Sequence, residues 1–414
     1  MPRLLLLIPS TSYRTADFLN AAERLGADVV VASNERQTLE QVVPGKSLTL
    51  DFIDLNGSTE KAVAFARQYP IDAVVSTDEE ATVLAAMISE ALSLAHNPVT
   101  ATAAAKDKQR LREILTSASV PTPSFQVFST DEPAEEIARR ILYPCVIKPT
   151  FLSASRGVIR ADDPNTFQTA FHRLLQLLKE PEVRRLGGPA AKKVLVEQFI
   201  QGEEVALEGL LQDGRLSLLA LFDKPDPLNG PFFEETLYIT PSRLPATVQR
   251  EVADAAQRAT AALGLREGPI HAELRINNQG AFIIEVAARS IGGLCSRTLR
   301  FGVGLTLEEI ILRNALGLQI ESLERQKKAA GVMMIPIPKA GILNNYGGID
   351  DARKIPGIEA VTITLRRKQK VIPLPEGRRY LGFIFARGER PEEVEAALRE
   401  AHRKLTFDIL PPPS

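Results

Sequence analysis

The chain has 414 residues, which is long enough for two or three domains with cores of their own. Its 50 Lys and Arg residues balance 51 Asp and Glu residues, so the formal charge of −1 provides no overall attraction to nucleic acid or to an anionic membrane. Hydrophobic residues make up 44% of the chain and charged residues 24%, which is typical of a globular protein and excludes disorder over long stretches.

Cysteine usage and the apolar runs indicate a reducing compartment and exclude the membrane. Cys145 and Cys295 are too few for a disulfide scaffold or a cysteine-based zinc site, so the cytoplasm is the expected location. No segment approaches the roughly 18 to 20 apolar residues that a membrane span needs.

The first hundred residues alternate between short apolar runs and helical patterns. The apolar runs lie at 4–8, 28–32 and 71–76, and the helical patterns at 15–25, 58–68 and 79–95. Strand–helix–strand units of this length form right-handed parallel crossovers. This segment is therefore predicted to be a small, doubly wound parallel sheet.

Asp78 and Glu79 follow the third of these strands, at the edge of the sheet where α/β proteins tend to bind ligands. Contact with a substrate is one interpretation of the two carboxylates. The interpretation that we favour is that they cap the N-terminus of the following helix.

The remaining elements predict a mixed architecture. From residue 194, the runs VLVEQFI, EEVALEGLL and RLSLLALF are separated by turn residues, a pattern typical of an antiparallel meander. Strands and one helix after residue 331 predict an α+β tail. The other expected elements are helices at 106–118, 133–141, 164–179, 245–263, 306–316 and 391–404, strands at 125–128 and 144–149, and a hairpin at 271–286.

The hairpin carries two glutamates that one register places side by side. HAELRI and AFIIEV flank NNQG, and a three-residue loop at 278–280 sets Glu273 directly opposite Glu285. Like charges facing each other across a sheet are destabilising, so a cation such as Mg²⁺ would relieve them. A loop of two or four residues would instead send the two glutamates to opposite faces.

A lysine ends the strand CVIK just before a loop of small residues. Lys148 lies at this strand end, and the loop TFLSASRGV contains Ser153, Ser155 and Gly157, whose N–H and hydroxyl groups can surround phosphate oxygens. A lysine beside such a loop can act as a point charge on a phosphate. Ordinary turns use the same residues, and the chain has no G-x-x-x-x-G-K-[ST] motif, so this loop alone does not identify a nucleotide site.

Five motifs, in this order, resemble those of the ATP-grasp superfamily. They are KDKQRLREIL…VPTP (106–123), YPCVIKP (143–149), SASRGV, VEQFIQGEE (196–204) and HAELRINNQGAFIIEVAARSIGG (271–293). Within the superfamily, the stretch DKPDPLNGPFFEETLYITPSRL (223–244) and the tail make the chain most similar to L-amino acid ligases and carnosine-synthase-like carboxylate–amine ligases.

The resemblance implies an α/β protein, α+β in its C-terminal half, with the ATP-grasp fold. Four domains are expected: an N-terminal α/β domain at 1–105, an A subdomain with a mobile phosphate loop at 106–192, a B subdomain with the metal site at 193–325, and a ligase-like α+β domain at 326–414.

The resemblance also implies ATP and Mg²⁺, or Mn²⁺ in its place, as cofactors. The lysines would contact the phosphates, the Ser–Gly loop would close over them, residues 197–200 would lie beside adenine, and Glu204 would hold the ribose. Glu273 and Glu285 would carry the metal. The residues assigned to ATP are Lys108, Lys148, Ser153, Ser155, Gly157, Glu197, Gln198, Phe199, Ile200 and Glu204.

Further residues are assigned by the resemblance to the substrate. Arg289, acting with Lys148 in catalysis, would stabilise the acyl phosphate or a carboxylate, as a bidentate guanidinium can. Glu235, with Tyr238 beside it, would pair with an α-ammonium. Gly292 and Gly293 stand where some relatives carry a bulky residue, which predicts a roomier site.

The implied function is an ATP-dependent carboxylate–amine ligase that joins two amino acids, or an amino acid and another small amine, and releases ADP and phosphate. Its partners would be small molecules and a second copy of the chain, with no nucleic acid or membrane. The alternatives are a purine-pathway or carboxylase-like ATP-grasp enzyme, and a nucleotide-binding protein that has lost catalysis. Ala287 suggests the last, because many family members have a metal-binding Asn there.

Three other features carry no functional prediction. The basic run Arg366, Arg367, Lys368 and Lys370 is typical of a solvated strand or turn. His271 is expected to be packed or half exposed. Cys145 is expected to be an inert buried thiol, and Cys295 has no nearby His to act as a base.

Overall fold

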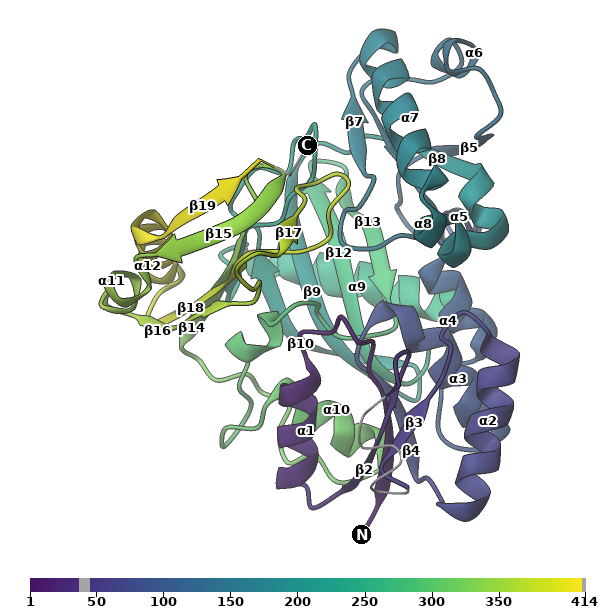
Figure 1. Cartoon of the computed structure of the whole chain (residues 1–414), viewed down its shortest axis with the longest axis vertical. Coiled ribbons are helices and arrows are strands. Elements are labelled where there is room, and N and C mark those ends of the chain that lie inside the picture. The colour runs from purple at the N-terminus through teal and green to yellow at the C-terminus, as the bar shows by residue number, and fades with distance from the viewer. Residues whose placement is uncertain (37–44, 412–414) are drawn as a thin grey trace.

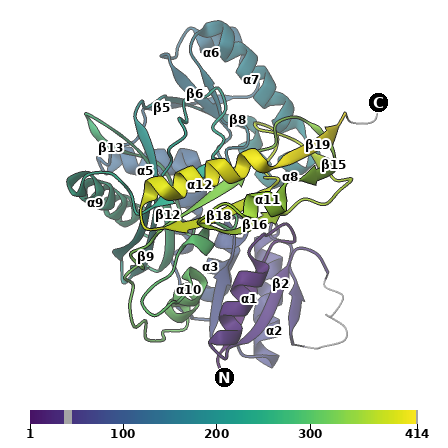
Figure 2. The same ribbon diagram turned by 90° about the vertical axis from the view of Figure 1, so that its left-hand side faces the viewer.

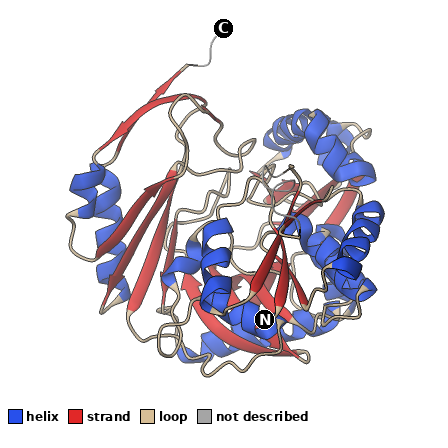
Figure 3. Cartoon of the chain, turned by 60° about the horizontal axis from the view of Figure 1, so that its bottom comes forward, coloured by secondary structure: helices blue, strands red, loops and turns tan. Residues whose placement is uncertain are grey.

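The computed structural model describes residues 1–36 and 45–411. Figure 1 shows an N-terminal domain at the bottom, a lobe rich in helices at the upper right and the C-terminal part at the left, all arranged around one large sheet. Strands run through the middle of the molecule and most helices lie toward its outside (Figure 3). In the described residues, no helix is both long enough and apolar enough to cross a membrane.

The N-terminal domain is the predicted parallel sheet, in the order β3-β2-β1-β4. Alternate leucines of β1 pack against α1 on one face and against α2 and α3 on the other, which explains the continuous apolar run. The predicted helix at 79–95 begins as a 3₁₀ turn, Glu79–Ala81. The elements are β1 (Arg3–Leu7), α1 (Thr15–Arg24), β2 (Asp28–Ser33), β3 (Ser47–Thr49), α2 (Leu55–Gln68), β4 (Ala73–Ser76) and α3 (Thr82–Ala91).

The lobe at the upper right contains a sheet in the order β5-β8-β6-β7. The prediction that VLVEQFI opens an antiparallel meander is wrong, because β8 (Lys193–Gln198) lies inside this sheet. Four consecutive buried residues suit β8 to a central strand. The other elements are β5 (Phe125–Ser129), α6 (Ala134–Ala138), β6 (Cys145–Lys148), β7 (Ile159–Ala161), α7 (Pro164–Lys179), α8 (Pro181–Gly187) and a 3₁₀ turn (Gly188–Lys192).

The large sheet has the order β13-β12-β9-β10-β11-β14-β18-β16, so strands of the tail extend it directly. The helix predicted at 245–263 is α9, which ends at Gly264 in the left-handed conformation. The elements up to residue 315 are α4 (Val99–Lys106), α5 (Lys108–Ser117), β9 (Glu203–Gln212), β10 (Arg215–Asp223), β11 (Leu237–Thr240), α9 (Ala246–Leu263), β12 (Gly268–Asn277), β13 (Gly280–Ala287), a 3₁₀ turn (Cys295–Thr298) and α10 (Leu307–Ala315).

The C-terminal part has the predicted α+β composition. Helix α12 lies across the end of the large sheet, over β14 and β18 (Figure 2), and a separate sheet has the order β17-β15-β19. The elements are β14 (Ala329–Ile335), β15 (Gly341–Gly347), α11 (Ile349–Arg353), β16 (Ile358–Ile363), β17 (Lys370–Val371), β18 (Gly382–Gly388), α12 (Pro391–Lys404) and β19 (Thr406–Leu410).

Candidate active site

The two hairpin glutamates face each other because the hairpin contains a β-bulge. The predicted three-residue loop is wrong: the turn has two residues, and Asn277 pairs with Gly280. A regular ladder from that turn would put Glu273 opposite Ile284 and send Glu285 to the other face. The register shifts beside Glu273, and this bulge restores the predicted pairing of Glu273 with Glu285.

Backbone groups at the bulge are bound by the segment that precedes β5. Arg112 of α5 donates from Nη2 to the carbonyl of Ile284, at 2.6 Å. The N–H of Ile283 donates to the carbonyl of Pro121 at 2.9 Å, and Thr122 Oγ1 donates to the carbonyl of Ile283 at 3.2 Å. Because β13 is an edge strand, these contacts satisfy groups that no further strand could reach.

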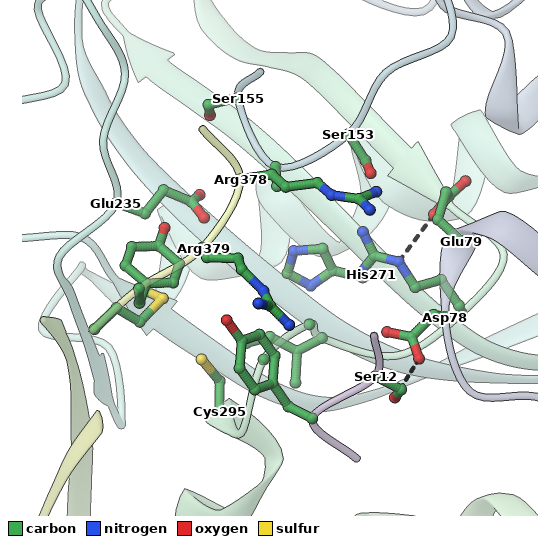
Figure 4. Close-up of a pocket in the computed structure, with 18 of the residues that line it drawn as sticks. Ser12, Asp78, Glu79, Ser153, Ser155, Glu235, His271, Cys295, Arg378 and Arg379 are labelled. Carbon is green, nitrogen blue, oxygen red and sulfur yellow. Dashed lines mark hydrogen bonds and ion pairs between the residues drawn. The ribbon is translucent and has the colours of Figure 1, made fainter. Parts of the chain in front are cut away.

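Two cavities meet at these glutamates. The larger, which we call the central pocket, has a volume of about 200 Å³ and is lined by Glu235, Tyr238, Arg289, Gly292 and Gly293 among others (Figure 4). The smaller, which we call the inner cavity, has a volume of about 80 Å³. The two share the lining residues Ser153, Ser155, Glu235, Glu273 and Glu285.

The inner cavity brings together nine of the ten residues assigned to ATP, all except Gly157: Lys108, Lys148, Ser153, Ser155, Glu197, Gln198, Phe199, Ile200 and Glu204. Its apolar walls include Phe199 and Phe233, whose rings lie 6.3 Å apart, and Arg275 stacks 4.8 Å from the centre of Phe199. A flat aromatic base fits between such walls, and Lys108 Nζ lies 3.6 Å from Glu285.

Gly157 adopts a left-handed conformation, with φ of +76°, and its N–H donates to the carbonyl of Pro375 at 2.8 Å. That N–H is therefore engaged by the C-terminal part in this conformation. Ser153 and Ser155, by contrast, lie on the border between the two cavities.

The buried Lys148 shares a carboxylate with Arg112. Glu197 lies 2.7 Å from Lys148 Nζ and 2.8 Å from Arg112 Nε. Burial lowers the pKa of Lys148, although the charge of Glu197 opposes this effect. The pKa of Glu197 is lowered because the two cations outweigh the effect of burial. Of these three residues, Lys148 and Glu197 line the inner cavity.

Lys224 lies at the centre of three carboxylates. Its Nζ is 2.8 Å from Glu204, 2.5 Å from Glu235 and 3.4 Å from Glu273. Burial alone would lower the pKa of Lys224, but the three carboxylates raise it well above its usual value. Burial raises the pKa of Glu235 to about 7, and the OH of Tyr238 donates to this carboxyl at 2.7 Å.

His271 lies between Glu273 and a buried carboxylate. Its Nδ1 lies 2.8 Å from Glu208 and its Nε2 lies 3.6 Å from Glu273. Although burial opposes protonation, hydrogen bonds to Glu208 and Glu273 raise the pKa of His271 to about 9. The imidazole is buried, so the expectation of a packed histidine is confirmed, with a charge that the sequence did not predict.

Arg289 is oriented by the N-terminal domain. Its Nε donates to Glu79 at 2.8 Å. The favoured interpretation that Asp78 caps a helix is wrong, because Asp78 makes no capping bond and instead accepts from Ser12 Oγ at 2.6 Å. Both carboxylates line the central pocket.

The glycines and the cysteine at the floor of the central pocket differ in what surrounds them. A Cβ on Gly292 would meet no atom within 4 Å, whereas one on Gly293 would lie 3.0 Å from the ring of Phe383. Cys295 lines the pocket, but burial raises the pKa of its thiol, so the thiol stays protonated. Burial also raises the pKa of Cys145, to about 12, which agrees with an inert thiol.

The paired glutamates fit a hard divalent cation. Their side chains are about one-fifth exposed, and the nearest ammonium groups are Lys224 and Lys108, at 3.4 and 3.6 Å. Glu273 is also approached by His271 Nε2 at 3.6 Å, so its oxygens are only partly engaged. Two partly solvated carboxylates with free oxygen lone pairs, beside a cavity that could hold phosphates, are the ligands that Mg²⁺ prefers. Ala287 is buried and lines neither cavity.

Sequence reasoning missed the residues that hold the predicted ones in place. Arg112, Glu208, Lys224 and Arg275 are buried charged side chains, each paired with a site residue or a neighbour of one. In sequence, they resemble ordinary charges on a helix or strand. Only Lys224 could have been noticed in the sequence, because it stands in DKPDP directly after an apolar run.

Family models match three successive segments of the chain. Residues 19–96 match the ATP-grasp N-terminal domain, residues 141–298 the ATP-grasp domain, and residues 333–409 the L-amino acid ligase C-terminal domain 2. A crystal structure of an L-amino acid ligase from Bacillus licheniformis is 28% identical, covers 99% of both chains and superposes with a TM-score of 0.84.

Curated relatives match over a shorter length. Alanine–anticapsin ligase of Bacillus subtilis is 28% identical over 266 residues, which are 61% of this chain and 56% of the relative. Dapdiamide A synthase of Enterobacter agglomerans is 27% identical over 242 residues, 58% of this chain and 55% of the relative. The chain thus spans about half the length of these curated relatives.

Proposed function

The chain belongs to the ATP-grasp superfamily, and from this premise we propose that it is an ADP-forming ligase. It would join the carboxylate of one amino acid to the amine of a second small molecule. The observation that carries the proposal is the shared border of the two cavities, where Glu273 and Glu285 face both. A nucleotide in the inner cavity and a carboxylate in the central pocket would meet there.

The reaction has two steps. A carboxylate oxygen attacks the γ-phosphorus of ATP, the bond between the β–γ bridging oxygen and the γ-phosphorus breaks, and ADP leaves. The amine then attacks the acyl carbon, phosphate leaves with the former carboxylate oxygen, and the amine loses a proton. When bound at Glu273 and Glu285, Mg²⁺, or Mn²⁺, neutralises charge on the phosphates.

The chain's own residues position the reactants and stabilise charge. Lys148 and Lys108, at the wall of the inner cavity, offer ammonium groups to the transferring phosphoryl group. Arg289 is held by Glu79 and by the carbonyl of Ser290, and its side chain lines the central pocket, where it would stabilise the acyl phosphate. Glu235 would bind the α-ammonium of the amino acid whose carboxylate is activated.

A matrix of amino acid pairs, scored for ADP release and by mass detection of products, tests this function. Glu285→Gln removes a metal ligand, and Lys148→Met removes a phosphate contact. We expect each to lower turnover at least about a hundredfold. Glu400→Gln, an exposed change on α12, is the matched control and should leave turnover unchanged. Wild-type rates in the first two variants would remove the site assignment.

The alternatives predict other outcomes of the same assays. ATP turnover with bicarbonate, formate or glycinamide ribonucleotide, and not with amino acids, would support a purine-pathway or carboxylase-like enzyme. Thermal stabilisation by ATP–Mg²⁺ without phosphate release in any mixture would support a nucleotide-binding protein that has lost catalysis. A homodimer and a cytoplasmic location stay predictions, which light scattering and cell fractionation would test.

A further inference from the structure

A basic hollow lies beside the central pocket, in the C-terminal part of the chain. It has a volume of about 490 Å³ and is lined by Thr364, Arg366, Arg367, Lys368, Gln369 and Arg379. Most of these residues form the turn between β16 and β17, which was expected to be an ordinary solvated turn. Exposed charges on a turn carry no function by themselves.

The hollow contains cations without acidic partners. In the described part of the chain, no carboxylate lies within 4 Å of the charged groups of Arg366, Arg367, Lys368 or Arg379. The neighbouring Arg378, by contrast, is neutralised by Glu80 at 2.8 Å and by Glu182 at 3.6 Å. The hollow is therefore a concentrated positive field that nothing in this part of the chain balances.

The turn that presents these cations is held in a fixed shape. Lys368 N–H donates to the carbonyl of Leu343 at 2.7 Å, and the side-chain oxygen of Gln369 accepts from the N–H of Arg366 at 3.1 Å. The guanidinium of Arg367 stacks 5.2 Å from the ring centre of Tyr346. A turn braced in this way loses little entropy when it binds a ligand.

Arg379 connects the hollow with the central pocket, because it lines both. Figure 4 shows its side chain extending into the pocket between Glu235 and Cys295. The inner cavity borders the same pocket through the paired glutamates, and Arg379 does not line it. The three spaces therefore follow one another: inner cavity, central pocket, basic hollow.

This order places the amine substrate next to the hollow. The leaving phosphate of an acyl phosphate lies toward the inner cavity, where the nucleotide is proposed to bind, so the amine must approach the acyl carbon from another side. Arg379 lines the central pocket and the hollow but not the inner cavity. An anionic group on the amine substrate would reach Arg379 and the turn while its nitrogen faces the acyl carbon.

We propose that Arg379 and the basic hollow bind an anionic side group of the amine substrate, so that this substrate is an acidic amino acid or a similarly charged amine. The inference rests on the proposed ligase function. One α-carboxylate would neutralise only one of the four cations, so the field favours a substrate that carries a second anionic group, either a carboxylate or a phosphate.

Pairs of amines that differ in charge test the proposal on the full-length protein. Rates of product formation are compared for L-glutamate against L-glutamine, L-aspartate against L-asparagine, and O-phospho-L-serine against L-serine. We expect kcat/KM to favour the charged member of at least one pair by about tenfold or more, as a charge-assisted hydrogen bond would give. The pair with the larger ratio identifies a carboxylate or a phosphate, and added salt should reduce the ratio.

Substitutions test whether Arg379 and the turn cause the preference for a charged amine. Arg379→Gln should reduce the charged-to-neutral ratio toward one, and Arg379→Lys should restore part of it. Arg403→Gln, an exposed change outside the three cavities, should keep the ratio. The paired change Arg366→Gln and Arg367→Gln should lower the ratio partly, because these residues contribute to the field without lining the pocket.

Hydroxylamine separates this inference from the proposed function, because it traps the acyl phosphate as a hydroxamate and carries no anionic group. In Arg379→Gln, ligation of the charged amine should fall at least about tenfold more than hydroxamate formation. An equal fall would place Arg379 on the activated acid and overturn the inference, as would equal use of charged and neutral amines by the wild type. If no acid gave ADP and hydroxamate, the ligase function would fail, and the inference with it.

Discussion

Lys224 links buried carboxylates at the border of the two cavities. It contacts three glutamates, and Arg275 and the charged His271 each approach one of the three, at 2.8 and 3.6 Å. Three cations therefore face three carboxylates. Because burial raises the pKa of Glu235 to about 7, this carboxyl is partly protonated near neutral pH.

At Gly292, the sequence predicts a wide pocket, and a larger residue there would narrow it. A side chain at this position points into open space, and the backbone is not in the left-handed region. Gly292→Leu should therefore lower kcat/KM for amino acids with large side chains by about tenfold or more, and change small ones by less than about threefold. Competition assays with alanine and phenylalanine would measure this.

Gly293, unlike Gly292, has no room for a side chain. Its φ is +62°, and a Cβ would press on Phe383, so Gly293→Ala should lower the melting temperature, whereas Gly292→Leu should not. Acceptance of only glycine and alanine by the wild type would contradict the prediction of a roomy pocket.

The charge on His271 makes stability depend on pH. Its folded pKa of about 9 lies above the usual 6.5, so the stabilisation is fully present below pH 6.5 and is lost as the pH rises through 9. This contribution is about 3 kcal/mol. Melting temperatures of the metal-free protein should fall between pH 7 and pH 9.5, and His271→Gln should flatten that slope. An unchanged slope in the variant would show that other groups titrate.

At the scale of elements, the sequence predicted which strands and helices exist better than how they join. Apolar runs and Gly264 located the N-terminal sheet and α9, because burial and capping are local properties. The pairing of Glu273 with Glu285 was predicted from a three-residue loop, and the structure reaches it by a two-residue turn and a bulge. Arg112, which binds a carbonyl at the bulge, lies far away in sequence, so no local pattern could indicate this contact.

The contacts of Arg112 predict an order of stability between two variants. Glu197→Gln would leave Arg112 and Lys148 buried without a counter-charge, which costs about 3–5 kcal/mol. Arg112→Met leaves Glu197 paired with Lys148 and orphans mainly the carbonyl of Ile284, which costs about 1–3 kcal/mol. Urea unfolding should therefore rank Glu197→Gln as the less stable variant.

Arg112→Met has a second readout, because the bulge sets the position of Glu285. We expect weaker binding of Mn²⁺, measured by electron paramagnetic resonance without substrates, at a temperature where the variant is folded. Arg110→Met, on the exposed face of the same helix, is the control. Equal Mn²⁺ affinity in wild type and Arg112→Met would show that the bulge holds its register without this side chain.

At the scale of the whole molecule, the C-terminal part closes the site as well as extending the large sheet. Pro375 and Glu376 accept from the N–H of Gly157 and from Arg156 Nε through their carbonyls, each at 2.8 Å. The Glu376 side chain accepts two hydrogen bonds from Arg173, at 2.5 and 2.9 Å. The small residues indicated a phosphate-binding loop and the family resemblance implied that it moves, but a contact across more than 200 positions leaves no local signal.

Weakening the ion pair between Glu376 and Arg173 should uncouple ATP hydrolysis from product formation. Glu376→Gln removes the charge that holds Arg173, so the loop should open more often and admit water to the acyl phosphate. We expect more ADP released per product formed, by about twofold to fivefold, with little change in melting temperature because both side chains are partly exposed. Glu132→Gln, which breaks the ion pair with Arg140 elsewhere in the same lobe, is the matched control and should leave coupling unchanged. Coupling equal to the wild type in Glu376→Gln would mean that the backbone contacts at Gly157 and Arg156 are sufficient to close the loop.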